Sequence, residues 1–406
     1  MNAVACDTID MDSHIVEPRD AWSRHIEPAF RNEALAIVDV PAEVHGVHGQ
    51  RPHLAIGGRH LFAVGAVVPL GLAQENERAA APDASERPVF AAIRDILFPL
   101  EASSPPEGHD GRARLRWMDG AGIERAVICP TWGLMWEQYL TTRPAIVCAN
   151  MRAYNKWLRD FCAPNPSRLV GVGELTLLDV DWAIEEAERL AHDGFRTVRL
   201  RPTLHGGKTI THPDFDRFWD VLAHHDLGLV FHIDGQGTDG DVFLDEAWYF
   251  GEERGPASGL MVGCMPHLPA MMTLTAMFRV RMFDRHPTLR LALLELGAGW
   301  LTPYLELADQ VFRLARGNAG KGRAMPSEIA ARQIWATPLE AESVSAIVQK
   351  SGGPPVCFGS DYPHPESSHT PIAVWTEKLG DVSDAVKAAF FRTNAARYLG
   401  GTLTPL

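Results

Sequence analysis

Short apolar segments alternate with amphipathic segments from residue 112 onward, and this alternation limits the possible folds more than any other feature of the sequence. Runs that are apolar throughout are typical of parallel strands covered on both faces. Such runs occur at 8–11, 126–129, 169–172, 197–200, 228–233, 289–294, 333–336 and 356–358. Segments of helical periodicity lie between most of them, at 152–162, 182–192, 214–225, 269–284, 302–316, 341–351 and 383–399. Eight strands alternating with helices predict a (β/α)8 TIM barrel, in the α/β class.

The same pattern predicts one barrel domain over residues 1–406, with long insertions after the first and fifth strands at about 15–112 and 234–266. A short packed helix is expected near 89–98, inside the first insertion. No GxGxxG motif follows the first strand, which argues against a dinucleotide-binding Rossmann domain. The second insertion contains residues that would suit a lid over an apolar or aromatic substrate, although packing of the insertion onto the barrel is favoured for most of them: Phe243, Trp248, Tyr249, Phe250, Met261 and Met265.

Composition excludes several classes of partner. The net charge is −13 and no basic block occurs, so binding to nucleic acid or to an anionic membrane surface is not expected. No apolar run approaches the roughly 20 residues of a membrane span. The acidic N-terminus is unlike a secretory signal, and the six cysteines form no CxxC pair. We therefore expect buried free thiols in a reducing, cytoplasmic compartment, with a small molecule as the substrate. Apolar faces on helices 300–316 and 383–399 would allow a homo-oligomer.

The active site of such a barrel lies at the carboxyl ends of its strands, where several polar residues are predicted. Asp12 and His14 are two apart on the first strand and therefore face the same way. His232 ends the apolar run of the fifth strand, and Asp361 follows the eighth. Glu295 follows the sixth strand, where an unpaired buried charge would cost several kcal/mol, so it needs a cation, a proton or a basic partner.

Each of these residues also has an ordinary structural explanation, such as a cap, a core histidine or a salt bridge, and only their convergence indicates a site. Two imidazoles and three carboxylates are enough to bind one or two divalent ions. The carboxylate-rich set favours manganese or iron over zinc. Asp361 and Glu295 are also the candidate general bases. Arg199 and Arg201, near the end of the fourth strand, could bind a substrate carboxylate, although a structural role is favoured for both.

Together these motifs resemble the second family of the amidohydrolase superfamily, which includes aminocarboxymuconate-semialdehyde and resorcylate decarboxylases. The resemblance rests on Asp12-Ser13-His14 with Glu17-Pro18, Tyr154-Asn155-Lys156-Trp157-Leu158, Arg168-Leu169-Val170-Gly171, His232, Glu295-Leu296-Gly297-Ala298-Gly299-Trp300, Ser360-Asp361-Tyr362-Pro363-His364 and Asn394-Ala395-Ala396-Arg397.

The resemblance implies metal ligands at the first, fifth and eighth strands, which are Asp12, His14, His232 and Asp361 here. The usual His-x-His of the first strand is Asp12-x-His14, and Glu295 stands where decarboxylases of the family usually have a catalytic histidine. No lysine lies where binuclear relatives hold a carboxylated one.

Three hypotheses follow. The first is a hydrolase or non-oxidative decarboxylase that depends on one or two ions of Zn, Mn or Fe and acts on a small apolar or aromatic carboxylate, ester or amide. The second is a non-haem di-iron monooxygenase that hydroxylates an apolar substrate. The third is a binding protein on a barrel that has lost catalysis. The polar constellation argues against the third hypothesis, and the first two need the same five residues: Asp12, His14, His232, Glu295 and Asp361.

Overall fold

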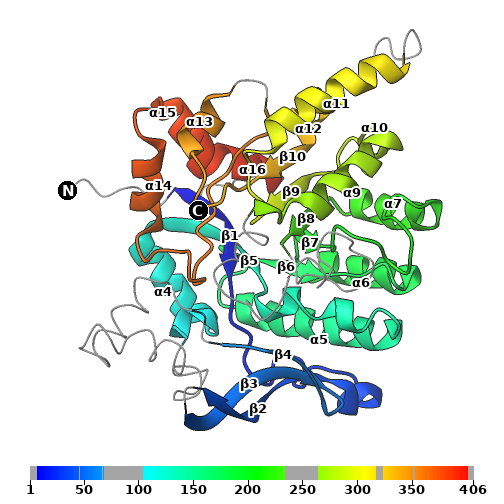
Figure 1. The fold of residues 1–406 in the computed structure, drawn as a ribbon, viewed down its shortest axis with the longest axis vertical. Helices are drawn as coiled ribbons and strands as arrows, with labels where there is room; N and C mark the ends of the chain where they lie inside the picture. Colours follow the sequence, from blue (N-terminus) through cyan, green and yellow to red (C-terminus); the bar gives the residue numbers. More distant parts are fainter. Residues whose placement is uncertain are drawn as a thin grey trace.

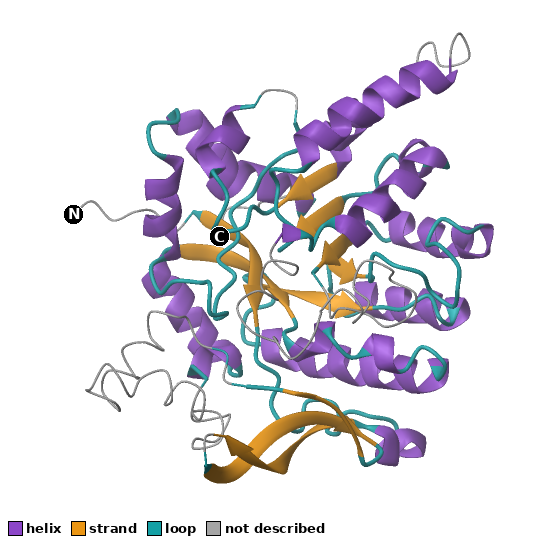
Figure 2. Ribbon diagram, in the orientation of Figure 1, coloured by secondary structure: helices purple, strands orange, loops and turns teal. Residues whose placement is uncertain are grey.

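A computed structural model describes residues 7–44, 46–65, 67, 104–233, 264–316, 323–350 and 353–400. Its main feature is a sheet of parallel strands in the order β1-β5-β6-β7-β8-β9-β10, curled so that helices cover its outer face (Figures 1 and 2). The strands are β1 (Thr8–His14), β5 (Ile123–Cys129), β6 (Leu169–Glu174), β7 (Thr197–Arg199), β8 (Gly228–His232), β9 (Leu291–Leu294) and β10 (Ile334–Ala336).

Residues 356–358 close this sheet into a barrel. Val356 forms a parallel bridge with Ala336 of β10, and the Cys357 N–H donates to the Ala336 carbonyl at 2.9 Å. On the other side, the Met11 N–H of β1 donates to the Phe358 carbonyl at 2.9 Å. The predicted eighth strand is therefore reduced to a bridge and a few hydrogen bonds, but it occupies the expected position. The predicted (β/α)8 fold is confirmed.

Side chains that point into the barrel make a compact inner core, which supports the carboxyl ends of the strands from below. These residues include Ile9, Met11, Val127, Val172, Val230, Ala292 and Leu294. A larger core lies between the sheet and the surrounding helices. The close-packed inner core therefore supports the side chains at the carboxyl ends of the strands.

Every predicted helical segment contains a helix, with shifted ends. The helices are α4 (Gly111–Ala121), α5 (Pro144–Cys162), α6 (Val180–His192), α7 (Asp216–His224), α9 (Leu268–Arg279), α10 (Met282–Arg285), α11 (Leu301–Arg316), α12 (Pro326–Gln333), α13 (Val344–Gln349), α14 (Pro371–Leu379), α15 (Asp384–Ala388) and α16 (Asn394–Tyr398). Three of these helices were not predicted: α4, α12 and α14. The helix predicted at 269–284 divides into α9 and α10 because Arg281 adopts a left-handed conformation with φ of 60°. The helix predicted at 383–399 includes a π-helical turn, Ala389–Thr393.

The first insertion contains a second sheet that the sequence pattern did not predict. It consists of β2 (Leu35–Val44), β3 (Val47–Ile56) and β4 (Arg59–Ala63), all antiparallel, and lies beside α5 in Figure 1. Leu35, at its start, donates its N–H to the Asn150 side chain of α5 at 2.8 Å. Its polar residues do not alternate strictly with apolar ones, which is why the period-2 signal was weak.

Some predictions fall outside the described residues. These include the helix near 89–98 and the lid residues Phe243, Trp248, Tyr249, Phe250 and Met261. Met265 is described and is exposed. Among the cysteines, Cys129, Cys148, Cys162 and Cys357 are buried and free, as expected, whereas Cys264 is exposed. No helix in the described ranges is both long enough and apolar enough to cross a membrane.

Candidate metal centre

The structure brings all five predicted residues to one point at the carboxyl end of the barrel. His14 and His232 are the last residues of β1 and β8, and Glu295 follows β9 directly. The Nε2 atom of His14 lies 3.4 Å from Asp12 Oδ1, 3.3 Å from Asp361 Oδ1 and 3.7 Å from Glu295 Oε2. The Nε2 atom of His232 lies 3.2 Å from Asp12 Oδ1 and 3.7 Å from Glu295 Oε2.

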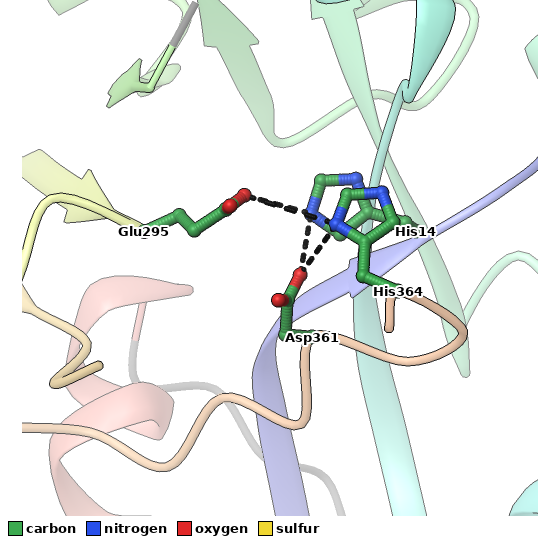
Figure 3. A group of neighbouring side chains, drawn as sticks. All are labelled: His14, Glu295, Asp361 and His364. Carbon is green, nitrogen blue, oxygen red and sulfur yellow. Dashed lines mark ion pairs between the residues drawn. The ribbon is translucent and has the colours of Figure 1, made fainter. Parts of the chain in front are cut away.

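A third imidazole, His364, joins this group and was not among the predicted ligands. Its ring stacks on that of His14 with centroids 3.9 Å apart. Its Nδ1 atom lies 2.9 Å from Asp361 Oδ1 and 4.0 Å from Glu295 Oε2, as Figure 3 shows. His364 lies in a loop, where no periodicity indicates direction. Its place in the motif Ser360-Asp361-Tyr362-Pro363-His364, three residues after Asp361, was the signal available from the sequence.

Hydrogen bonds fix which nitrogen of each imidazole faces the site. A backbone carbonyl can only accept, so a ring nitrogen bonded to it must carry the hydrogen. Nδ1 of His14 bonds the Pro130 carbonyl at 2.7 Å, and Nδ1 of His232 bonds the Ile233 carbonyl at 2.8 Å. In its neutral ring, Nε2 of His14 therefore presents a lone pair to the carboxylates. Burial alone would lower the pKa of His232, but Asp12 raises it, and Nε2 of His232 bonds Asp12 Oδ1 at 3.2 Å.

The centre consequently collects acceptors that face one another. His14 Nε2, Glu295 Oε2 and Asp361 Oδ1 are buried, and none of them has a hydrogen-bond partner. Lone pairs directed at lone pairs are unfavourable unless protons or a cation lie between them. Imidazole nitrogens and carboxylate oxygens are also the donors that divalent transition metals prefer. The residues present therefore fit a divalent ion, in two overlapping groups: Asp12, His14 and His232, and His14, Glu295, Asp361 and His364.

The pKa values of the centre also reflect the crowding of buried acidic and basic groups. Burial and the neighbouring Asp361 raise the pKa of Glu295 well above its usual value. Burial, with Glu366 and Asp12 nearby, does the same to the pKa of Asp361. Burial and the nearby His364 lower the pKa of His14 to about 3, so this ring is neutral at ordinary pH. Burial alone would raise the pKa of Asp12, but His232 and His14 hold it well below its usual range.

Two of the carboxylates sit on strained backbone. Glu295 has φ of 52° and Asp361 has φ of 55°. The left-handed region costs a residue with a Cβ roughly 1–2 kcal/mol. Strained conformations of this kind concentrate at functional sites, where the surrounding structure holds them. The structure thus directs both carboxylates to the centre against the local preference of the chain.

Neighbouring polar residues hold the set in place. The Thr337 hydroxyl donates to Asp12 Oδ2 at 3.2 Å and accepts the Glu295 N–H at 3.1 Å.

The two arginines considered above as carboxylate binders have other partners. Arg199 makes a bidentate ion pair with Glu174 at 2.8 and 2.7 Å. Arg201 is buried, and its Nη2 atom lies 3.4 Å from Gln138 Oε1.

Solved structures share this fold. An amidohydrolase from Mycobacterium avium subsp. paratuberculosis is 22% identical, with a TM-score of 0.76 over 97% of this chain and 99% of that chain. A 5-carboxyvanillate decarboxylase from Novosphingobium aromaticivorans, solved with bound manganese, is 16% identical, with a TM-score of 0.61 over 97% of each chain. A 2,6-dihydroxybenzoate decarboxylase from Rhizobium is also 16% identical, with a TM-score of 0.57 over 97% and 98%.

The search of curated proteins finds no match. The family model described as "Amidohydrolase" matches residues 9–401, which is nearly the whole chain and includes every residue of the centre. The protein therefore belongs to this amidohydrolase family, as the resemblance in its sequence implied.

Proposed function

We propose that the protein is a divalent-metal-dependent enzyme that removes the carboxyl group of a small aromatic acid without oxidation. The observation that carries this proposal is the cluster of buried, unpartnered acceptors on His14, Glu295 and Asp361. Asp12, His14, His232, Asp361 and His364 would hold the ion, and Glu295 would lie beside it. When bound, the ion supplies a cationic anchor for the substrate carboxylate and a neighbouring oxygen.

A pocket next to the centre is the place where this substrate would bind. Asp12, Glu295 and Asp361 line one part of it, and Leu339 and Trp375 contribute apolar wall. Among its described lining residues there is no Lys, Arg or His. An acid bound there would therefore depend on the metal for its counter-charge, with its apolar part against the wall.

Glu295 is the proposed proton donor. Burial and the neighbouring Asp361 raise the pKa of Glu295, which favours the protonated form that a proton donor needs. When the bond between the ring carbon and the carboxyl carbon breaks, its electron pair stays on the ring carbon and takes up that proton as carbon dioxide leaves. Asp361, whose pKa is raised in the same direction, is the second candidate. In a hydrolase, either group would instead act as the general base toward water.

The structural neighbours named as decarboxylases support placing decarboxylation before hydrolysis, since their folds cover nearly the whole chain. The test begins with elemental mass spectrometry of protein purified without added metal. The protein is then assayed for carbon dioxide release from hydroxybenzoates, in parallel with ester and amide hydrolysis.

About one manganese or zinc per chain with release of carbon dioxide supports the proposal. Hydrolysis without release of carbon dioxide would change the proposed reaction to hydrolysis and leave the proposed metal centre unchanged. About two irons per chain with substrate-dependent oxygen consumption would replace the decarboxylase proposal with the monooxygenase hypothesis. Absence of bound metal, even after incubation with Mn²⁺ or Zn²⁺, would refute both enzymes.

A further inference from the structure

The segment that follows β5 contacts two of the three imidazoles of the centre. The Pro130 carbonyl accepts from Nδ1 of His14, as described above. The next residue, Thr131, is buried, and its Oγ1 lies 2.9 Å from Nε2 of His364. Neither Pro130 nor Thr131 is among the metal-ligating groups. This segment is therefore placed to orient ligands without binding the ion itself.

The direction of the Thr131 hydrogen bonds settles the state of His364. The Thr131 hydroxyl has one hydrogen, and it donates that hydrogen to the Ile15 carbonyl at 2.6 Å. Toward His364 the same oxygen can only accept, so Nε2 of His364 carries a hydrogen. In a neutral ring the lone pair must then be on Nδ1, the atom that faces Asp361 and Glu295.

Glu17 holds this segment rigidly. Its carboxylate is buried and accepts three consecutive backbone N–H groups, from Thr131 at 3.2 Å, Trp132 at 3.0 Å and Gly133 at 2.8 Å. Gly133 permits the close approach, because a Cβ there would lie 2.7 Å from the Pro130 ring and 3.0 Å from Glu17. Glu17 of the Glu17-Pro18 motif, which was not among the predicted ligands, therefore fixes the backbone of the segment that follows β5.

We infer that Thr131 is a positioning residue, which fixes His364 in the tautomer with a free Nδ1 and so makes it a ligand of the metal centre. The inference rests on the proposed function, because it needs a metal ion to be bound. Partners that orient metal-binding imidazoles in this way typically change metal affinity about 10- to 100-fold when they are lost.

The test measures binding of Mn²⁺ alone, from the electron paramagnetic resonance signal of the free ion, so no substrate is needed. Thr131→Val removes the hydroxyl at nearly constant volume and is expected to weaken Mn²⁺ binding about 10- to 100-fold. Thr131→Ser keeps the hydroxyl and is expected to bind as the wild type does. Thr197→Val is the matched control, since Thr197 is a buried threonine that bonds Tyr398 at the opposite end of the barrel.

A double-mutant cycle distinguishes positioning from a general loss of structure. If Thr131 acts through His364, the pair Thr131→Val and His364→Gln should bind Mn²⁺ no more weakly than His364→Gln alone. Additive losses would overturn the inference. Wild-type affinity in Thr131→Val would also overturn it, and failure of wild-type protein to bind Mn²⁺ would instead reject the proposed function.

Folding of each variant is checked by circular dichroism in chelator. If Thr131→Val does not fold, Thr131→Ala replaces it in the cycle. If neither folds, the inference is overturned, because Thr131 would then support the barrel instead of orienting His364.

Discussion

Replacing Glu295 by glutamine should stabilise the metal-free protein while weakening metal binding. In the metal-free centre, Glu295 Oε2 is buried without a donor and faces the Nε2 atoms of His14 and His232 at 3.7 Å. A glutamine amide has the same shape and supplies N–H groups that can donate to the lone pair of His14 Nε2. An unsatisfied buried polar group costs about 1–3 kcal/mol, so we expect the free energy of unfolding to rise by about that amount.

Glu174→Gln is the matched control, and its expected sign is opposite. Glu174 is buried, and both of its oxygens accept from Arg199, at 2.8 and 2.7 Å. Breaking a satisfied buried ion pair costs about 3–5 kcal/mol, because the remaining charge loses its partner. The same chemical change should therefore stabilise one site and destabilise the other.

The stabilisation should also depend on pH. Burial and Asp361 raise the pKa of Glu295 in the folded protein above the usual 4.5, so between these values the folded state holds more protons than the unfolded state. The wild type then loses stability as pH rises above 4.5, whereas the glutamine side chain of the variant cannot ionise. The advantage of Glu295→Gln should be larger near about pH 8 than near about pH 5.

Urea unfolding followed by tryptophan fluorescence, in the presence of EDTA, measures all three proteins. Mn²⁺ titration of the folded proteins measures the accompanying loss of affinity. If Glu295→Gln destabilised the metal-free protein as much as Glu174→Gln does, the carboxylate would already have a satisfactory partner. The argument for an acceptor cluster that needs a cation would then be wrong.

Three further predictions concern the centre and its support. His232→Ala and Asp361→Ala should each remove most bound metal and activity. The circular dichroism spectrum should stay unchanged, because the barrel core lies elsewhere. Wild-type metal content by elemental analysis in either variant would reject the assigned site. Gly133→Ala should destabilise the protein by about 1–3 kcal/mol in urea unfolding, because the new Cβ would lie 2.7 Å from the Pro130 ring. Chelation should lower the melting temperature and addition of Mn²⁺ should restore it, since an ion bound only by the folded state stabilises that state; a melting temperature that ignores both treatments would contradict metal binding.

Much of the framework followed from the sequence. Apolar strands that alternate with helices specified the barrel, because strand and helix periods are local properties of the chain. The rule that active sites lie at the carboxyl ends of barrel strands then grouped Asp12, His14, His232, Glu295 and Asp361 correctly in space. Their roles as ligands and catalytic groups stay predictions, which the experiments above test.

Other features depended on contacts between residues far apart in the chain. The β2–β4 sheet was missed because its alternation is weak, and the burial of Leu35 and Ile37 depends on packing within the larger core. His364 was missed because its loop carries no periodic signal, and its direction depends on Thr131, which is 233 residues away in sequence. Arg199 was recognised as a polar residue at a strand end, but only its register opposite Glu174 gave it a partner.

The sequence by itself determined which residue types reach the mouth of the barrel, since strand direction and chain order are enough to place them there. Only the tertiary structure decided which nitrogen of each imidazole faces inward and which acceptors are left without donors. Those properties depend on hydrogen bonds of about 3 Å between separate segments, and such distances are set by the packed barrel as a whole.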